Sequence, residues 1–215
     1  NESATATFFQ TKEWMQLWLK HFPSPYRLHG VFDRSKLIGI IPLLDTAQGK
    51  EFIGIAQVLG KECVSDFGDI IAKRGREREV WKTVVEGVRD PASSAGRQGS
   101  GISLGFNFIR QDSPSYEILK ELGGKPTEVD VAPFIDLPKT WDEYLLSLNR
   151  HDRHELRRKM RKLEAEGAEI IRPEASEDLT IEFLRLMQLS NEQKRDFLSE
   201  QMRDFFSDVI RIFST

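Results

Sequence analysis

The stretch LHGVFDRSKLIGIIPLL, residues 28–44, decides the fold class of this 215-residue chain. Two apolar runs, residues 28–32 and 37–44, flank Asp33-Arg34-Ser35, and these residue types favour a tight turn. Apolar runs on both sides of a short polar turn predict a β-hairpin. Proline cannot donate a hydrogen bond to a neighbouring strand, so we expect Pro42 to lie at an edge or a bulge.

Segments on both sides of the hairpin add helices and further strands. Apolar residues at helical spacing predict a first helix over residues 8–22, with its aromatic face buried against the sheet. Capping residues mark later helices, which begin at Ser113-Pro114, at the capping box Thr140 to Glu143, and at Ser176. The remaining helices are expected at residues 77–88, 150–166 and 197–213, and the remaining strands at residues 51–58, 102–108, 128–137 and 168–172. Residues 64–71 are expected to form a short strand or a loop.

The order of these elements is a helix, a meander of strands, and then helices mixed with strands. No regular alternation of strand and helix is present, which argues against a doubly wound parallel sheet. We expect an α/β fold of the α+β kind, with a mixed β-sheet flanked by helices and followed by a helical C-terminal segment. The chain begins on Asn1 and stops directly after an amphipathic pattern, so we expect a piece of a longer protein.

Charge and cysteine content narrow the class of protein. Lys and Arg number 31 and Asp and Glu number 34, so a role on nucleic acid would depend on a local basic patch. The single cysteine, Cys63, excludes a disulfide within the chain and favours a reducing compartment, so we expect a cytoplasmic protein. The longest apolar run, residues 37–44, is far shorter than the roughly 20 residues that span a bilayer.

A basic helix is the most distinctive feature of the chain. Residues 150–166 contain seven basic and four acidic residues, a local net charge of +3. Arginines recur every three or four residues, which places them on one helical face that could bind phosphates of a nucleotide sugar, tRNA, CoA or anionic lipid. The alternative is a solvated helix with internal ion pairs such as Glu155 with Lys159, and composition alone favours this alternative.

Other candidate groups carry weaker signals. Asp66 and Asp69 could include a general base, although Asp and Gly in this stretch also suit a turn. The glycine loop at residues 96–101 precedes a strand-like run and lacks a following Lys-Ser/Thr pair, so we expect a flexible loop and no phosphate cradle. The four histidines have no partners at zinc-like spacing, and we expect no metal.

Four segments together resemble the FemAB/CelD-like acyltransferases. They are FFQTKEW at residues 8–14, LIGIIPL at 37–43, SDFGDI at 65–70, and the Arg-rich helix with its flanks at 148–167. Their order and spacing also match, and the resemblance covers nearly the whole chain.

The resemblance implies two GNAT-like regions, a first half over residues 1–138 and a helical linker with the start of a second half over 139–215. It implies transfer of an acyl or aminoacyl group to an amine of a small molecule or saccharide, in cell-envelope or exopolysaccharide synthesis. The donor would be acyl-CoA or aminoacyl-tRNA, and Asp66 or Asp69 would be the base. It also implies anion-binding roles for Arg150, Arg153, Arg157, Arg158 and Arg161.

A second hypothesis comes from another class of protein. The chain could be a non-catalytic binding module or scaffold that uses the basic helix at residues 150–166 on a polyanion, including peripheral contact with an anionic membrane. The overall charge of -3 argues against specific binding to DNA.

Overall fold

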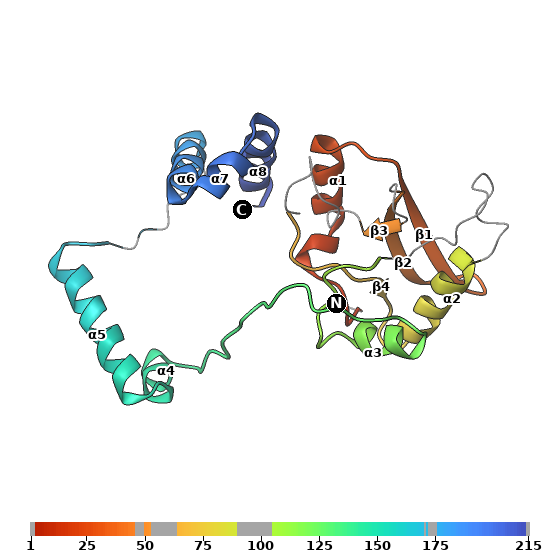
Figure 1. Cartoon of the computed structure of the whole chain (residues 1–215), viewed down its shortest axis with the longest axis horizontal. Helices are drawn as coiled ribbons and strands as arrows, with labels where there is room; N and C mark the ends of the chain where they lie inside the picture. Colours follow the sequence, from red (N-terminus) through yellow and green to blue (C-terminus); the bar gives the residue numbers. More distant parts are fainter. Residues whose placement is uncertain are drawn as a thin grey trace. The chain divides into compact units, whose positions relative to one another are not determined.

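The computed structural model divides the chain into two compact units (Figure 1). Asn1–Asp130 and Ser176–Thr215 form the first unit, and Val131–Ala175 form the second. The first unit combines a sheet with helices, so the expected mixed α/β class is confirmed. The residues that the structure describes are 3–45, 50–52, 64–89, 105–169, 171 and 176–213.

The sheet of the first unit is built around one strand. β1 (Tyr26–Asp33) and β2 (Lys36–Asp45) pair antiparallel, which confirms the predicted hairpin. β3 (Lys50–Phe52) and β4 (Ile71–Ala72) pair antiparallel with two different parts of β2. Pro42 lies between those two parts, so among the described strands it pairs with β1 alone, as expected for a residue that lacks an N–H.

One helix covers the sheet at close range. α2 (Glu77–Arg89) approaches β2 at Gly39, where an added Cβ would lie only 2.5 Å from a methyl carbon of Val80. Only glycine permits that approach. Val80 and Trp81 are completely buried in a core with apolar residues of β1 and β2. α3 (Pro114–Glu121) packs partly buried side chains on the same core.

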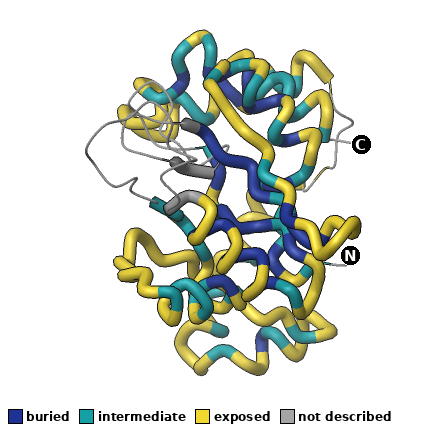
Figure 2. Tube along the Cα trace, turned by 90° about the vertical axis from the view of Figure 1, so that its right-hand side faces the viewer, coloured by how far each residue is buried: buried dark blue, intermediate teal, exposed yellow. Residues whose placement is uncertain are grey.

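A second core in this unit is mostly aromatic. α1 (Lys12–His21) and α8 (Glu200–Phe213) meet there, and the rings of Trp14 and Phe205 lie 5.5 Å apart. The expectation that the first helix buries its aromatic face is confirmed, but its main partner is α8 rather than the sheet. Figure 2 shows these inward positions as buried and the outer helical faces as exposed. The remaining elements around this core are η1 (Phe8–Gln10), α6 (Glu177–Ser190) and α7 (Glu192–Phe197).

The second unit contains two consecutive helices, α4 (Trp141–Ser147) and α5 (Arg150–Ala165). The predicted capping box is present. The Thr140 hydroxyl accepts a hydrogen bond from the Glu143 N–H, and the Glu143 carboxylate accepts one from the Thr140 N–H. Asn149 caps α5 directly after α4 ends. Gly167, at a φ of 71°, follows the end of α5, which confirms the predicted glycine stop.

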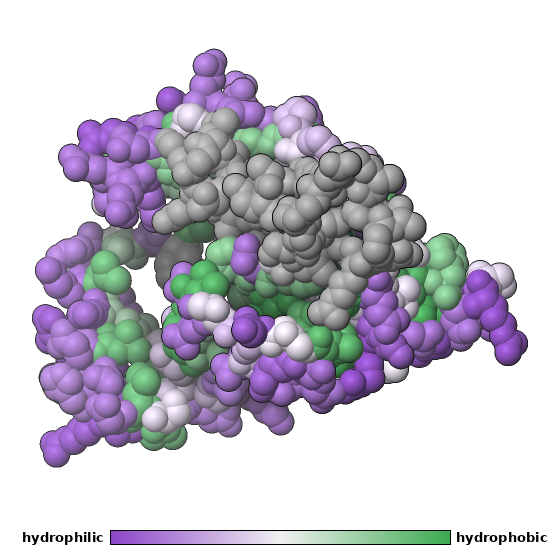
Figure 3. Space-filling model, turned by 45° about the vertical axis from the view of Figure 1, so that its right-hand side comes forward, coloured by the Kyte–Doolittle hydropathy of each residue, from purple (hydrophilic) through white to green (hydrophobic). Residues whose placement is uncertain are grey.

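One predicted strand is wrong over its whole length. Residues 128–137 form no strand, although their apolar and acidic residues alternate as a half-buried strand requires. Phe134 and Leu137 are 83% and 81% exposed. Figure 3 shows that hydrophobic patches interrupt the mostly hydrophilic surface on the face that it presents. The predicted helix at 197–213 is confirmed as α8 (Glu200–Phe213), which begins three residues later than expected because Phe197 ends α7.

Several other predictions concern residues that the structure describes only in part or not at all. Cys63 and the glycine loop at 96–101 lie outside the described residues, as does most of the strand expected at 51–58. The described parts of 102–108 and 168–172 form no strand. No described helix is long and apolar enough to cross a membrane. The division at residue 138 remains a prediction, although α6 to α8 share a core with α1.

Candidate functional site

The basic residues of α5 fall into two groups with different surroundings. Arg158 donates two hydrogen bonds to Glu155, at 2.7 and 2.8 Å, and Lys159 lies 4.0 Å from the same carboxylate. Lys162 lies 3.6 Å from Glu166. The hydrogen bond from Arg158 lowers the pKa of Glu155 to about 2. This part of α5 therefore matches the interpretation of a solvated, internally paired helix, and Arg158 belongs to it.

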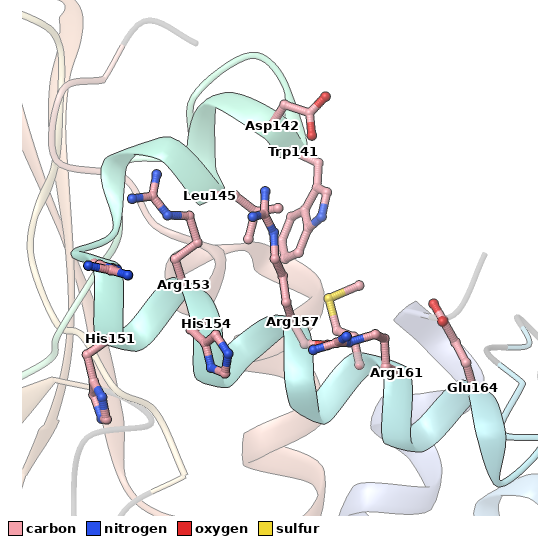
Figure 4. A pocket seen from close by; sticks show the side chains of 11 residues that line it. Trp141, Asp142, Leu145, His151, Arg153, His154, Arg157, Arg161 and Glu164 are labelled. Atoms are coloured by element: carbon pink, nitrogen blue, oxygen red, sulfur yellow. The ribbon is translucent and has the colours of Figure 1, made fainter.

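The other group lines a groove between α4 and α5 with a volume of about 1060 Å³ (Figure 4). In this view the side chains of Arg153 and Arg157 extend from α5 toward α4, whereas His151 points away from α4. Four of the five predicted anion-binding arginines line this groove, and Arg158 does not. The full lining consists of Trp141, Asp142, Leu145, Arg150, His151, Arg153, His154, Arg157, Met160, Arg161 and Glu164.

The groove arginines have no acidic partner within the described part of the chain. Among the described residues, no carboxylate lies within 4.0 Å of the guanidinium nitrogens of these four arginines, although Asp142 and Glu164 also line the groove. Within the described residues, Arg161 donates one hydrogen bond, to the backbone oxygen of Arg157 at 3.3 Å. Guanidinium groups spaced three or four residues apart on one helix repel each other, and a bound phosphate or carboxylate would relieve that repulsion.

The groove also has apolar lining residues. Leu145 is buried at 5% exposure, and Met160 of α5 lines the same groove. Trp141 is 49% exposed and contacts Tyr144 at a ring distance of 5.4 Å. Met160 belongs to an apolar seam of α5 that is evident from the sequence, whereas Trp141 and Leu145 were not predicted to line a site. The two-residue connection between α4 and α5 could have indicated them, because so short a connection favours an antiparallel pair in which the first turn of α4 faces α5.

Asp69 lies in a different environment, inside the first unit at 4% exposure. One carboxylate oxygen accepts from Ser113 at 2.5 Å, and the other accepts from Ser115 and from the Ile70 N–H at 2.7 Å. Ser115 in turn accepts from the indole N–H of Trp81, at 2.7 Å. Burial raises the pKa of Asp69 to about 6, although the three hydrogen bonds lower it. The carboxylate therefore joins α2, α3 and the sheet, and both of its oxygens are occupied by the chain itself.

Asp66 is exposed, unlike Asp69 three residues later. Among the described residues, it has no hydrogen bond or ion pair. Its neighbour Phe67 lies under the guanidinium of Arg110, 5.5 Å from the ring centre. Of the two candidate bases, only Asp66 is open to a substrate.

The two sets of predicted site residues belong to different units. The carboxylates Asp66 and Asp69 lie in the first unit, and the groove arginines lie in the second. Among the described residues, no cluster of His, Cys, Asp or Glu is arranged to hold a metal ion. Comparison of the chain with protein-family models, curated proteins and solved structures found no match.

Proposed function

We propose that this chain is part of a cytoplasmic N-acyltransferase of the FemAB/CelD-like type with a GNAT-like fold. In this proposal the groove between α4 and α5 binds the phosphates of the donor or of a phosphate-bearing acceptor. The observation that carries the proposal is the set of four groove arginines without a carboxylate partner among the described residues. Arginine is the side chain best suited to bidentate phosphate recognition.

The reaction would be the attack of an amine on the carbonyl carbon of an acyl thioester or ester. The carbon–nitrogen bond forms, the thiol or hydroxyl leaves, and the nitrogen loses one proton. Asp66 is the better candidate to accept that proton, because it is exposed and has no partner among the described residues. Asp69 would have a structural role, since two serines and a backbone N–H already occupy its oxygens.

Binding of inorganic pyrophosphate and of CoA to the whole chain, measured by calorimetry, tests the phosphate site. We expect the double variant Arg153→Gln/Arg157→Gln to weaken both affinities at least about tenfold, because two charge-assisted contacts are lost. The matched control is Arg158→Gln/Lys159→Gln, which removes the same charge from the paired part of α5 and should change affinity less than about twofold. Equal losses in both variants, or none in the first, would contradict the proposal.

Acyl transfer is tested separately by the release of free CoA thiol from acetyl-CoA in the presence of a panel of amines and amino sugars. We expect Asp66→Asn to lower the rate of acyl transfer and to leave the affinity for CoA unchanged, because Asp66 would accept the proton of the amine and would not bind the phosphates. If the chain binds CoA but transfers no acyl group to any of these amines, the enzymatic role is contradicted and the phosphate-binding site is retained.

A second candidate is a polyanion-binding module without catalysis. Two observations favour it: the paired residues Arg158, Lys159 and Lys162 widen the positive surface of α5, and Asp69 is fully occupied. Such a module should bind a single-stranded oligonucleotide or anionic vesicles with an affinity that falls steeply between about 50 and 200 mM salt. A small-ligand enzyme should show no binding to either.

A further inference from the structure

We infer that β1 pairs with β1 of a second copy of this chain, so that the sheets of two copies join across a two-fold axis. The two strands run antiparallel, and Gly30 lies at the axis. The inference goes beyond the proposed function, because it concerns a strand of the first unit and does not depend on the phosphate groove.

The position of β1 in the sheet supplies an edge for this pairing. β1 pairs with β2 from Tyr26 to Asp33, and among the described strands it has no other partner (Figure 1). The opposite edge of an eight-residue strand presents N–H and C=O groups on which a further strand can form. β1 therefore has the length and the position that strand addition requires.

β1 lacks the features that usually protect an edge strand from association. Natural edge strands often carry a proline, a lysine or a bulge of their own. The sequence of β1 contains neither proline nor lysine. Its register with β2 shifts between Val31 and Phe32, but the extra residue, Ile38, belongs to β2. β1 itself is a regular strand that can accept a neighbour along its whole length.

One face of β1 is apolar and exposed. Tyr26, Leu28 and Phe32 occupy alternate positions of the strand and are 50%, 63% and 58% exposed. Leu37 lies opposite Phe32 on β2 and is 48% exposed, so the apolar patch extends onto the neighbouring strand. A contiguous exposed apolar patch of this kind is typical of an interaction surface.

The sequence of β1 is complementary to itself in one antiparallel register. When Gly30 lies opposite the partner's Gly30, Leu28 lies opposite the partner's Phe32. In the same register Arg27 lies opposite the partner's Asp33, and both residues are exposed. The two-fold axis makes each contact twice. Arg27 and Asp33 also interact within their own chain, and the pairing adds to those interactions.

Neighbouring registers lose this complementarity. A shift by one residue would place the apolar face of one strand on the same side as the opposite face of its partner, because side chains alternate between the two faces. A shift by two residues would keep the apolar faces together but would move Asp33 away from the partner's Arg27. The register with Gly30 at the axis matches both the apolar face and the charges.

Sedimentation velocity of the whole chain over a range of concentrations tests the inference. We expect a monomer–dimer equilibrium with a dissociation constant of about 1–100 μM, because one pair of strands gives an interface at the small end of specific complexes. Leu28→Lys should weaken the dimer at least about tenfold, since it places a charge opposite the partner's Phe32. The matched control is Leu186→Lys, the same substitution at a leucine of α6 in the same unit that is 54% exposed, which should change the dissociation constant less than about twofold.

A pair of charge reversals tests the register. Arg27→Asp and Asp33→Arg should each weaken the homodimer about tenfold, because each variant brings like charges together at both ends of the paired strands. A mixture of the two variants should form a mixed dimer with an affinity close to that of the wild-type chain, since both contacts between opposite charges return. Far-ultraviolet circular dichroism verifies that all four variants keep their secondary structure.

Several results would overturn the inference. They are a chain that stays monomeric up to about 500 μM, a dimer that Leu28→Lys does not weaken, and two charge reversals that the mixture does not rescue. Assemblies larger than a dimer would also overturn it, because the two-fold pairing occupies this edge of β1 in both copies. A dimer weakened by Leu186→Lys alone would place the interface on α6. Leu28→Lys should leave pyrophosphate binding unchanged, so the failure of this inference and the failure of the proposed function are distinguishable.

Discussion

Asp69 and the groove arginines are both charged groups, but the chain treats them in opposite ways. Asp69 is buried, and two hydroxyls and an N–H satisfy its oxygens. Arg153 and Arg157 are in an open groove without an acidic partner among the described residues. A buried carboxylate whose oxygens accept hydrogen bonds from the fold has a structural role, whereas a charge left without a partner on a concave surface is available to a ligand. Mutations in the two regions should therefore change different observables.

The largest effect on stability is expected at Asp69. Asp69→Ala should lower the free energy of unfolding by about 2–4 kcal/mol, because it leaves two serine hydroxyls and a backbone N–H without a buried acceptor. Asp69→Asn should cost less than half as much, since it keeps the shape and part of the bonding. Urea unfolding measures both values. Asp66→Ala is the exposed control. If it lowers the free energy of unfolding as much as Asp69→Ala does, the proposed difference between the buried and the exposed aspartate is contradicted.

The pH dependence of stability should carry the signature of the same residue. Burial raises the pKa of Asp69 to about 6 in the folded chain, above the ordinary value of 3.8. The folded state therefore binds more protons between these values, so the contribution of Asp69 to the free energy of unfolding falls as pH rises from about 4 to 6. The expected size of the fall is about 2–3 kcal/mol.

Asp69→Asn cannot titrate and should lack this fall. The measurement is the difference between the wild-type chain and Asp69→Asn in urea unfolding at pH 4, 5, 6 and 7. A difference that does not change with pH would show that the carboxylate does not titrate in this range in the folded state.

A partly buried ion pair should give an intermediate effect. Asp208 of α8 binds Lys20 and His21 of α1, at 2.5 and 2.8 Å, and Arg211 of its own helix. The hydrogen bond from Lys20, followed by those from Arg211 and His21, holds the pKa of Asp208 well below its usual range. The sign is therefore opposite to that of Asp69: this stabilisation is present above about pH 4 and is lost as pH falls through the folded pKa.

Asp208→Asn should lower the free energy of unfolding by about 1 kcal/mol at neutral pH, because Lys20 is mostly exposed and its contribution is screened. The loss should begin to shrink below about pH 4, where the unfolded chain binds a proton at Asp208, and should vanish only below the folded pKa. Thermal unfolding at pH 7 and pH 3 tests both statements, and a loss that grows on acidification would contradict them.

The smallest effect on stability is expected in the groove. Arg153→Gln/Arg157→Gln should change the free energy of unfolding by less than about 0.5 kcal/mol, because neither side chain has an ionic partner within the described residues. The same variant should show the large loss of phosphate affinity already described. A stability loss comparable to that of Asp69→Ala would mean that these arginines are structural, and the contrast between the two regions would disappear.

Local signals in the sequence predicted much of the secondary structure. The hairpin at residues 28–44, the capping box at Thr140 and the N-cap at Ser113 are confirmed, because each depends on residues close together in the chain. The strand predicted at 128–137 is wrong for the same reason. Its alternation is a local property, but a strand exists only where a neighbouring strand accepts its backbone hydrogen bonds, and no local pattern supplies that neighbour.

The candidate site also combines features that the sequence predicts with features that it does not. The spacing of Arg150, Arg153, Arg157 and Arg161 places them on one helical face, and this was evident from the sequence. The spacing could not show that Arg158 pairs with Glu155 while the others face α4, since both arrangements suit a charged helix. It also could not show that Trp141 stands beside them.

The sequence by itself determined the helices, the hairpin and the positive face of α5, because periodicity and capping act over a few residues. The burial and the hydrogen-bond partners of each charged residue depend on the tertiary structure. Asp66 and Asp69 are three residues apart, yet one is exposed and the other is enclosed by Ser113 and Ser115, more than 40 residues away in the chain. Burial and partners come from distant segments, and they decide whether a charged residue supports the fold or remains free to bind a ligand.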